Sequence, residues 1–307
     1  MRKRQMLVII IRMYKGLPKI SYAILLLATI LGSSLALLPA PVFATTIGCG
    51  STITASTTLK ADIGPCSSSN GLNIGASNIV LNCAGHTISG SGPYFGIYLG
   101  GITGVTVKNC SVTGFTGGTL GSGGPVGVGF ALLSSGNTLI GNTANDNYIG
   151  FALGSPSGNT LIGSTANGNF LGFILISSSY NTLIGNTANN NFAGFLISSN
   201  GPASSDNILK GNTANDNSLV GFFLMGATSN ELIGNTANSN GDFGFAISVS
   251  SGNTLKGNTA NSNTAYGYYD DSTGSGTAGT ANFYKGNECG GNLVGGSSPS
   301  GLGSPQF

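Results

Sequence analysis

The chain has 307 residues, of which 52 are glycine, 7% are charged and none is tryptophan. Six of its 11 lysines and arginines lie in the first 19 residues, so the remainder carries five lysines against nine acids, a net charge of −4. These five lysines look scattered along the sequence and offer no basic stripe for phosphates, which argues against nucleic-acid binding. Low charge with ordered apolar periodicity indicates a folded extracellular protein and excludes a disordered one.

Residues 1–44 have the features of a secretory signal peptide. Six basic residues precede an apolar run from Ala23 to Leu38, and the small-residue positions read by a signal peptidase end at Ala44. The run is about 16 residues long, shorter than the roughly 20 that a membrane-spanning helix needs. We therefore expect cleavage after Ala44, no membrane span afterwards, and a secreted, periplasmic or cell-surface protein. A true start at Met13 would shorten the long basic region.

The five cysteines suit an exported protein, which can keep disulfides. Cys49 and Cys66 bracket a short stretch before the repeats and form one natural pair. Cys83 and Cys110 lie 27 residues apart in LNCAG and KNCSV, about one turn of a solenoid. Strands of neighbouring turns lie roughly 4.8 Å apart, within reach of a disulfide, so these two form either a disulfide or a stack of unbonded thiols. Cys289 aligns with a repeat alanine, which predicts a buried free thiol.

Six nearly identical copies of the sequence NTLIGNTANDN lie between residues 137 and 263. The copies begin at Asn137, Asn159, Asn181, Asn207, Asn230 and Asn253. A repeat this short cannot bury its own apolar face, so the copies must stack into a solenoid. Divergent units near residues 78, 104 and 282 extend the array to about nine turns, or roughly 40 Å at the strand spacing.

Within each copy, apolar and polar residues alternate between glycine and asparagine corners, as expected of short strands. In the first copy, Leu139, Ala144 and Phe151 point inward while Thr143 and Asn145 point outward. The inward aromatic column contains Phe151, Phe173, Phe195, Phe222, Phe245 and Tyr268. The first asparagine column starts the copies, and the second contains Asn147, Asn169, Asn191, Asn217, Asn240 and Asn263. We predict hydrogen-bonded asparagine ladders and a stacked aromatic spine.

These patterns predict an all-β, single-domain β-solenoid. Leucine-rich repeats and left-handed β-helices are excluded because neither L-x-x-L-x-L spacing nor a six-residue apolar period is present. The expected segments are a signal peptide at 1–44, an N-terminal cap at 45–77, β-helix repeats at 78–294 and a flexible Gly/Ser tail at 295–307.

The segments CAGHTISG and GVTVKNCSVTGF, followed by serial NTLIGNTANDN units, resemble those of right-handed parallel β-helix repeat proteins. This group includes NosD-like periplasmic proteins and carbohydrate-binding and sugar-hydrolysis (CASH) domains with a pectate-lyase-like fold. The likeness covers about residues 45–294. It implies a three-faced right-handed coil, export and a link to polysaccharide. It does not imply one activity, because such proteins include lyases, hydrolases, epimerases and members without a known reaction.

The residues offer no convincing catalytic or metal site. Hydrolysis of a glycosidic bond uses two carboxylates roughly 5–10 Å apart, whereas Asp146 and Asp216 share a column but stand three turns, roughly 14 Å, apart. No arginine follows residue 44 to serve as a lyase base. Copper prefers Met, Cys and His ligands, and beyond the signal peptide only Met225 and His86 join the cysteines. We therefore name no catalytic residue, metal or cofactor, interpret His86 as structural, and leave enzymatic activity open, leaning against it.

One edge of the solenoid carries the variation in repeat length. Insertions follow the Gly-Phe strand at residues 154–158, 198–206 and 270–281, and insertions confined to one edge often mark a binding side. The polar and aromatic candidates near it are Asp206, Tyr268, Tyr269, Asp270 and Asp271. These residues could contact a sugar or a calcium ion, or they are ordinary solvated loop residues.

A flat polar face is the second candidate surface. Its outward threonine column contains Thr143, Thr165, Thr187, Thr213, Thr236 and Thr259. An asparagine follows two residues after each threonine, and the array is similar to the ice-binding faces of some β-solenoid antifreeze proteins. We hypothesise that the face orders water or lies along an extended glycan. Strand propensity and solubility would also explain it.

Three functions follow as expectations. The leading one is an exported, non-catalytic scaffold or surface-interaction protein whose candidate partner is extracellular or cell-surface polysaccharide. A polysaccharide-active lyase, hydrolase or epimerase comes second, and an ice-binding or water-ordering protein third. Release of unsaturated or reducing ends from a uronate polymer would favour the second.

Overall fold

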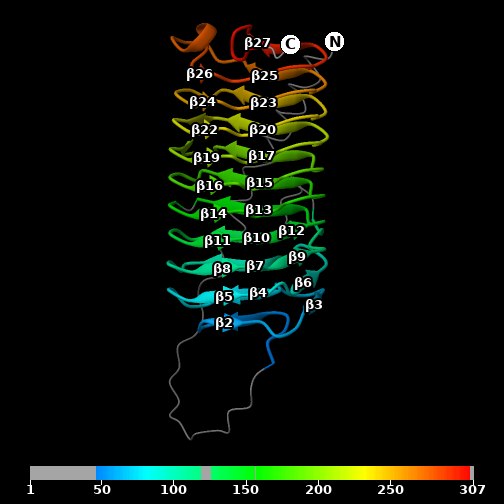
Figure 1. Cartoon of the computed structure of the whole chain (residues 1–307). Coiled ribbons are helices and arrows are strands. Elements are labelled where there is room, and N and C mark those ends of the chain that lie inside the picture. The colour runs from blue at the N-terminus through cyan, green and yellow to red at the C-terminus, as the bar shows by residue number, and fades with distance from the viewer. Residues whose placement is uncertain (1–45, 119–125, 156, 305–307) are drawn as a thin grey trace, which may run out of the picture.

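The computed structural model describes residues 46–118, 126–155 and 157–304, which form a right-handed parallel β-helix (Figure 1). About nine turns lie between a first coil and a final strand, as the repeat predicted. Within the described residues no helix has the length and apolar character needed to cross a bilayer. The predicted signal peptide, its cleavage after Ala44 and the alternative start at Met13 lie outside the described residues.

The strands of successive turns stack into three faces, which we name A, B and C. Among the described residues, face A has eleven strands: β1 (Ser51–Ile53), β4 (Leu72–Ile74), β7 (Phe95–Gly100), β10 (Val128–Leu133), β13 (Ile149–Gly154), β15 (Leu171–Ile176), β17 (Ala193–Ser198), β20 (Val220–Met225), β23 (Phe243–Ser248), β25 (Tyr266–Asp270) and β27 (Gly295–Ser298). Ten spacings of roughly 4.8 Å give the rod a length of roughly 48 Å.

Face B repeats the Thr-Leu-Ile segment of each copy. Its described strands are β2 (Thr57–Thr58), β5 (Val80–Asn82), β8 (Thr106–Lys108), β11 (Thr138–Ile140), β14 (Thr160–Ile162), β16 (Thr182–Ile184), β19 (Ile208–Lys210), β22 (Glu231–Ile233), β24 (Thr254–Lys256) and β26 (Phe283–Lys285). Every pair of neighbours is parallel, as a solenoid requires.

Face C begins as a sheet and continues as a ladder of single bridges. Its described strands are β3 (Ile63–Cys66), β6 (Thr87–Gly90), β9 (Ser111–Thr113) and β12 (Thr143–Asn145). From Thr143 onward one parallel bridge per turn joins successive threonines up to Thr259. The remaining described elements are β18 (Ser204–Ser205), β21 (Ala227–Thr228) and the short 3-10 helix η2 (Thr277–Gly279).

Three inward columns fill the interior of the coil: leucines from face B, alanines from face C and aromatic rings from face A. The rings of Phe151 and Phe173 lie parallel with centroids 4.6 Å apart, and the stack continues to Tyr268. Glycine precedes each ring because a Cβ at Gly150 would come within 2.8 Å of the Ala166 Cβ. The predicted aromatic spine is therefore present.

Asparagine ladders fix the corners between the faces. The two predicted columns are buried, and a third column, not anticipated from the sequence, contains Asn142, Ser164, Asn186, Asn212, Asn235, Asn258 and Asn287. In each ladder the backbone N–H of one turn donates to the side-chain oxygen of the next, for example from Asn186 to Asn212 at 2.8 Å. Buried backbone donors thereby gain partners that the parallel strands alone do not supply at the corners.

Both ends are more regular than the sequence suggested. Residues 51–74, assigned to the N-terminal cap, already provide the first strand of every face. The tail is also ordered as far as Ser304: β27 pairs with β25, and the backbone N–H of Cys289 donates to the carbonyl of Ser304 at 2.8 Å. The expected flexible tail was wrong there, because the last turn needs hydrogen-bond partners and Leu302, 2% exposed, covers the core.

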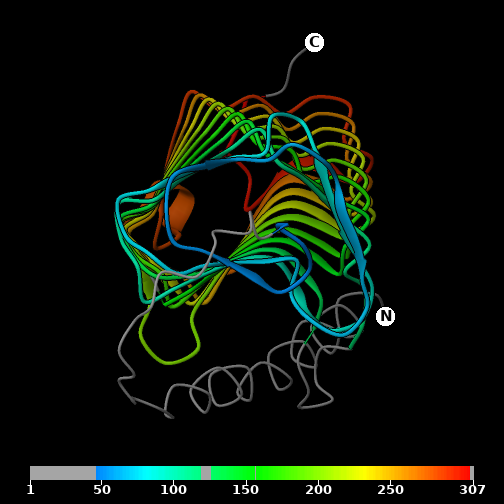
Figure 2. The same ribbon diagram turned by 90° about the horizontal axis from the view of Figure 1, so that it is seen from below.

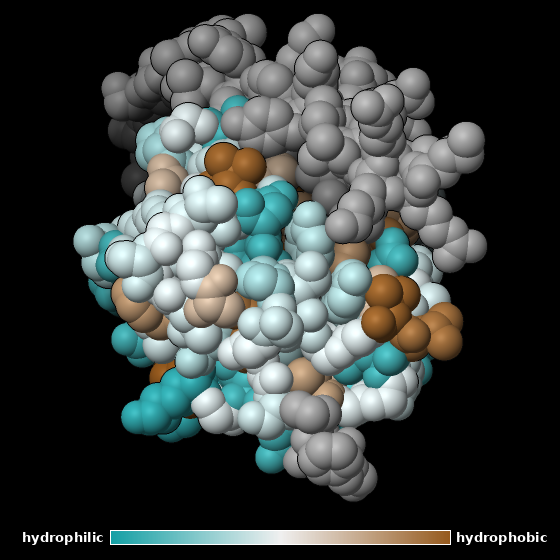
Figure 3. Space-filling model, turned by 90° about the horizontal axis from the view of Figure 1, so that it is seen from above, coloured by the Kyte–Doolittle hydropathy of each residue, from teal (hydrophilic) through white to brown (hydrophobic). Residues whose placement is uncertain are grey.

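The view down the rod axis shows the turns superimposed, with one longer loop protruding between β17 and β18 (Figure 2). The C-terminal end of the rod is largely pale or teal, with apolar side chains in separate brown patches (Figure 3). Phe283, Leu293 and Val294 are the large apolar residues exposed near this end. Exposed apolar residues in such small numbers are ordinary on a folded protein.

Candidate functional site

The outer side of face C carries the predicted threonine and asparagine columns. All six threonines, from Thr143 to Thr259, are half-buried and joined turn to turn by parallel bridges. Ser111 and Thr87 extend the column toward the N-terminal end through the pairing of β12, β9 and β6. The column therefore runs along the rod with one hydroxyl side chain per turn.

Hydrogen bonding leaves selected groups of this face available. The outward asparagines accept a backbone N–H from the next turn, as Asn189 does from Asn215 at 2.8 Å. Within the described residues, no protein group bonds their side-chain NH₂ or the hydroxyls of the six threonines. Face C thus offers hydroxyl donors and acceptors beside amide donors, repeated at roughly 4.8 Å.

Tyr268 does not belong to a binding surface. Its ring is 0% exposed, stacks on Phe245 at 5.1 Å, and its hydroxyl donates to the Asn258 carbonyl at 2.7 Å. Burial raises the pKa of this phenol far above its usual value. The prediction that Tyr268 contacts a ligand was wrong, because the side chain closes the aromatic spine.

Asp270 is likewise internal. It is 4% exposed and accepts hydrogen bonds from the Ser272 backbone N–H, the Asn282 side chain and the Tyr284 hydroxyl at 2.8–2.9 Å. Burial, followed by the Asp270 charge, raises the pKa of Tyr284. The prediction of a solvated or ligand-binding acid was wrong here, because Asp270 ties the loop after β25 to the last turn.

The other loop-edge candidates are not brought together. Asp271 is exposed and accepts from the Ser248 hydroxyl at 2.8 Å, while Tyr269 lies half-buried on the outer side of face A. Burial, followed by the Asp271 charge, raises the pKa of Tyr269. Asp206 is exposed at a corner between β17 and β19, three strand spacings or roughly 14 Å along the rod from β25. The expected cluster does not form.

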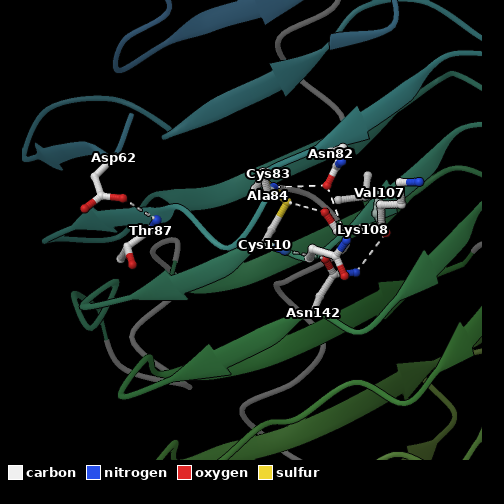
Figure 4. The surroundings of a disulfide bond; sticks show 10 residues. Asp62, Asn82, Cys83, Ala84, Thr87, Val107, Lys108, Cys110 and Asn142 are labelled. Atoms are coloured by element: carbon white, nitrogen blue, oxygen red, sulfur yellow. Dashed lines mark hydrogen bonds between the residues drawn. A yellow bond between two sulfur atoms is a disulfide. The ribbon is translucent and has the colours of Figure 1, made fainter. Parts of the chain in front are cut away.

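The N-terminal turns hold the disulfides and the histidine. Cys49 forms a disulfide with Cys66, and Cys83 forms one with Cys110, with Cα atoms 5.5 and 4.7 Å apart. Cys83 and Cys110 are therefore bonded and do not form a stack of free thiols (Figure 4).

His86 and Asp62 form a side-chain pair of 3.1 Å near the second disulfide. The Thr87 backbone N–H, followed by the His86 side chain, holds the pKa of Asp62 below its usual value. An open hollow of about 220 Å³ on the same side is lined by Gly85, Asn109 and Thr143 among others. The lining includes the hydroxyls of Ser111 and Thr143, but these groups hold no carboxylate pair and no second histidine.

The soft donors are dispersed or already engaged. Four cysteines form disulfides, and Cys289 is a buried free thiol whose pKa is raised by burial. Met225 lies on β20, far along the rod from His86, which directly precedes β6. The described residues contain no group of three or more His, Cys, Asp or Glu side chains placed to hold a metal ion. This donor set does not fit a copper site.

Face B carries a surface feature that the sequence analysis did not anticipate. The lysines that looked scattered are not: Lys108, Lys210, Lys256 and Lys285 all lie on the outer side of face B in one column. The signal was present in the repeat frame, because lysine takes the position of Ile140 in the units ILKGN, TLKGN and FYKGN.

Solved structures share the fold. The chain is similar to the A-module of Azotobacter vinelandii mannuronan C-5 epimerase AlgE4, with 15% identity and a TM-score of 0.54 over 85% of this chain and 87% of that one. Pectate lyase Pel9A is 17% identical, with a TM-score of 0.53 over 74% of this chain and 68% of the lyase. The Dettilon tailspike protein is 17% identical, with a TM-score of 0.53 over 80% of this chain and 60% of the tailspike. At such identities the likeness shows the fold alone.

Sequence comparison places the chain in a family. A search of curated proteins finds no significant match. The family model described as periplasmic copper-binding protein (NosD) matches residues 44–293, most of the chain and all of its repeats. The chain belongs to the NosD family.

Proposed function

We propose that the protein is an exported, non-catalytic β-helix scaffold that binds an extended polysaccharide chain along face C. The observation that carries this proposal is the array of unpaired Thr hydroxyls and Asn NH₂ groups, in register over six turns. Sugar hydroxyls both donate and accept hydrogen bonds, and face C supplies both kinds of partner in a straight line. Export is supported by the periplasmic description of the family and by two disulfides.

The family description also names copper, which the residues of this chain do not support. Its described donors are one histidine paired with Asp62, one methionine and one buried thiol, on different turns. We therefore derive no function from copper. The polysaccharide-active names among the solved structures favour a glycan ligand, but the corner acids Asp146 and Asp216 stand three turns apart, too far for paired carboxylates.

A glycan array combined with a polysaccharide-degradation screen tests the proposal. The wild-type protein should bind one or more neutral, extended glycans without releasing reducing or unsaturated ends. Thr187→Tyr, which places a ring in the centre of face C, should weaken binding at least about fivefold, or about 1 kcal/mol. The matched variant Thr182→Tyr, on face B, should bind as the wild type does.

If the protein binds no neutral glycan, or if the two tyrosine variants weaken binding equally, face C is not the binding site. Product release would instead establish the enzyme. Thermal hysteresis in the same preparation, abolished by Thr187→Tyr, would assign face C to water ordering rather than glycan binding.

A further inference from the structure

The lysine column, defined as Lys108, Lys210, Lys256 and Lys285, runs along the outer side of face B. In order along the rod, the full column reads Lys108, Ile140, Ile162, Ile184, Lys210, Ile233, Lys256 and Lys285. Seven strand spacings separate its ends, or roughly 34 Å. Four of the five lysines that follow the predicted signal peptide thus share one line parallel to the rod axis.

The charges of the column are not neutralised by the protein. Three of its lysines are exposed and Lys108 is half-buried. Within the described residues, no ion pair or hydrogen bond engages their ammonium groups. Lys256 and Lys285 are direct neighbours on β24 and β26, an arrangement of like charges that destabilises a sheet. Stability alone therefore does not explain the column.

Charge is strongly segregated between face B and the rest of the molecule. The strands of face B hold four lysines and a single acid, Glu231, a net charge of +3. The other residues after position 44 hold one lysine, Lys60, and eight acids, a net charge of −7. A positive strip on a negative rod attracts a polyanion to that strip and repels it elsewhere.

The floor between the lysines is flat and apolar. Ile140, Ile162 and Ile184 are 37–38% exposed, and a parallel column of threonines, including Thr138 and Thr160, lies two residues away along each strand. A ligand suited to this strip is long, unbranched and negatively charged, with C–H surface to lie on isoleucine.

We propose that face B binds a linear anionic polysaccharide along the lysine column. Its carboxylates or sulfates would lie opposite the ammonium groups, and the C–H faces of its sugar rings against the isoleucines. Nucleic acid fits less well, since phosphates follow each other about every 3.4 Å along one strand and four cations over roughly 34 Å would leave most of them unmatched. Base stacking also lacks a platform, because Phe283 is the one aromatic side chain on the outer side of the described face B strands.

Binding of the purified protein to polygalacturonate tests the proposal, with fully methyl-esterified polygalacturonate as the uncharged counterpart. We expect binding to the acid polymer at about 50 mM salt, strong weakening at about 500 mM salt, and much weaker binding to the ester. Replacing all four lysines by glutamine should weaken binding at least about tenfold. Lys60→Gln, which removes the one lysine after residue 44 that lies outside the column, should change binding less than about twofold.

A gain-of-binding variant guards against a folding artefact. Ile162→Lys adds a cation between Lys108 and Lys210 at an already exposed position, and it should tighten binding to the acid polymer about twofold. The double variant Lys256→Gln/Lys285→Gln should weaken binding while leaving the thermal midpoint unchanged or higher, because it relieves a like-charge contact.

The proposal is overturned if the four-glutamine variant, with wild-type circular dichroism, binds the acid polymer as tightly as the wild type. It is also overturned if the ester binds the Thr187→Tyr variant as tightly as the acid polymer does, or if duplex DNA or anionic vesicles bind more tightly than the acid polymer at equal salt. The ester is a neutral glycan, so ester binding that Thr187→Tyr abolishes belongs to face C and leaves the lysine column intact.

Discussion

The N-terminal and C-terminal turns keep the same coil in register by different means. Before Asn137 the corners carry two disulfides and the core is mainly aliphatic. After it, asparagine ladders run through every corner and phenylalanine rings stack on face A. The two devices meet in one column: the backbone N–H of Cys110 donates to the side chain of Asn142 at 3.0 Å. A covalent link and a hydrogen-bonded ladder thus serve equivalent positions.

The largest effect is expected in the aromatic stack. Phe195 is 1% exposed, with ring centroids 4.8 Å from Phe173 and 4.7 Å from Phe222. Phe195→Ala should lower the free energy of unfolding by about 4 kcal/mol, whereas Ile97→Ala in the aliphatic half should lower it by about 3 kcal/mol. Urea denaturation measures both. Equal losses would show that ring stacking adds nothing to burial.

Loss of the Cys83–Cys110 disulfide should lower the free energy of unfolding by nearly as much. Replacing Cys83 and Cys110 by serine opens a link between residues 27 apart, which predicts a loss of about 3.5 kcal/mol from chain entropy. Asparagine at both positions should recover part of that loss by extending the ladder from Asn142. A double asparagine variant no more stable than the serine variant would contradict the equivalence of the two devices.

Removal of a ladder residue should cost slightly less. Asn212 accepts from the Asn186 backbone at 2.8 Å and donates to the carbonyl of Leu183 at 2.9 Å. Asn212→Ala leaves these buried groups unpaired, for an expected loss of about 3 kcal/mol in urea denaturation. The matched change Asn215→Ala, on the half-buried outer column, removes one bond to Asn238 and should cost about 1 kcal/mol.

The smallest loss of stability is expected at alkaline pH, where the C-terminal end of the rod should be weakened. Burial raises the pKa of Tyr268 and Tyr284 in the folded state, so the protonated phenols stabilise the fold fully below the unfolded pKa of about 10. That stabilisation is lost as pH rises above this value. The denaturant midpoint should therefore fall between about pH 9 and about pH 11, and less steeply in Tyr284→Phe. A flat profile would contradict the buried placement of the two phenols.

The sequence was sufficient for most of the fold because repeats align their own columns. Leu139, Ala144 and Phe151 could be assigned inward since any other placement exposes six copies of each. Position in a repeat does not show which acids a loop encloses, so the burial of Asp270 against Tyr284 was not anticipated. The lysine column becomes visible only when divergent units such as TLKGN are aligned with TLIGN. Its members are far apart along the chain, so they look scattered in the unaligned sequence.

Hydrogen exchange of individual amides, with and without reductant, tests the two-device account most directly. Reduction of the disulfides should lower protection of amides in residues 79–113, where the Cys83–Cys110 bond holds neighbouring turns. Amides of residues 181–263, held by the asparagine ladders, should keep their protection. Equal loss of protection along the whole rod would contradict the account.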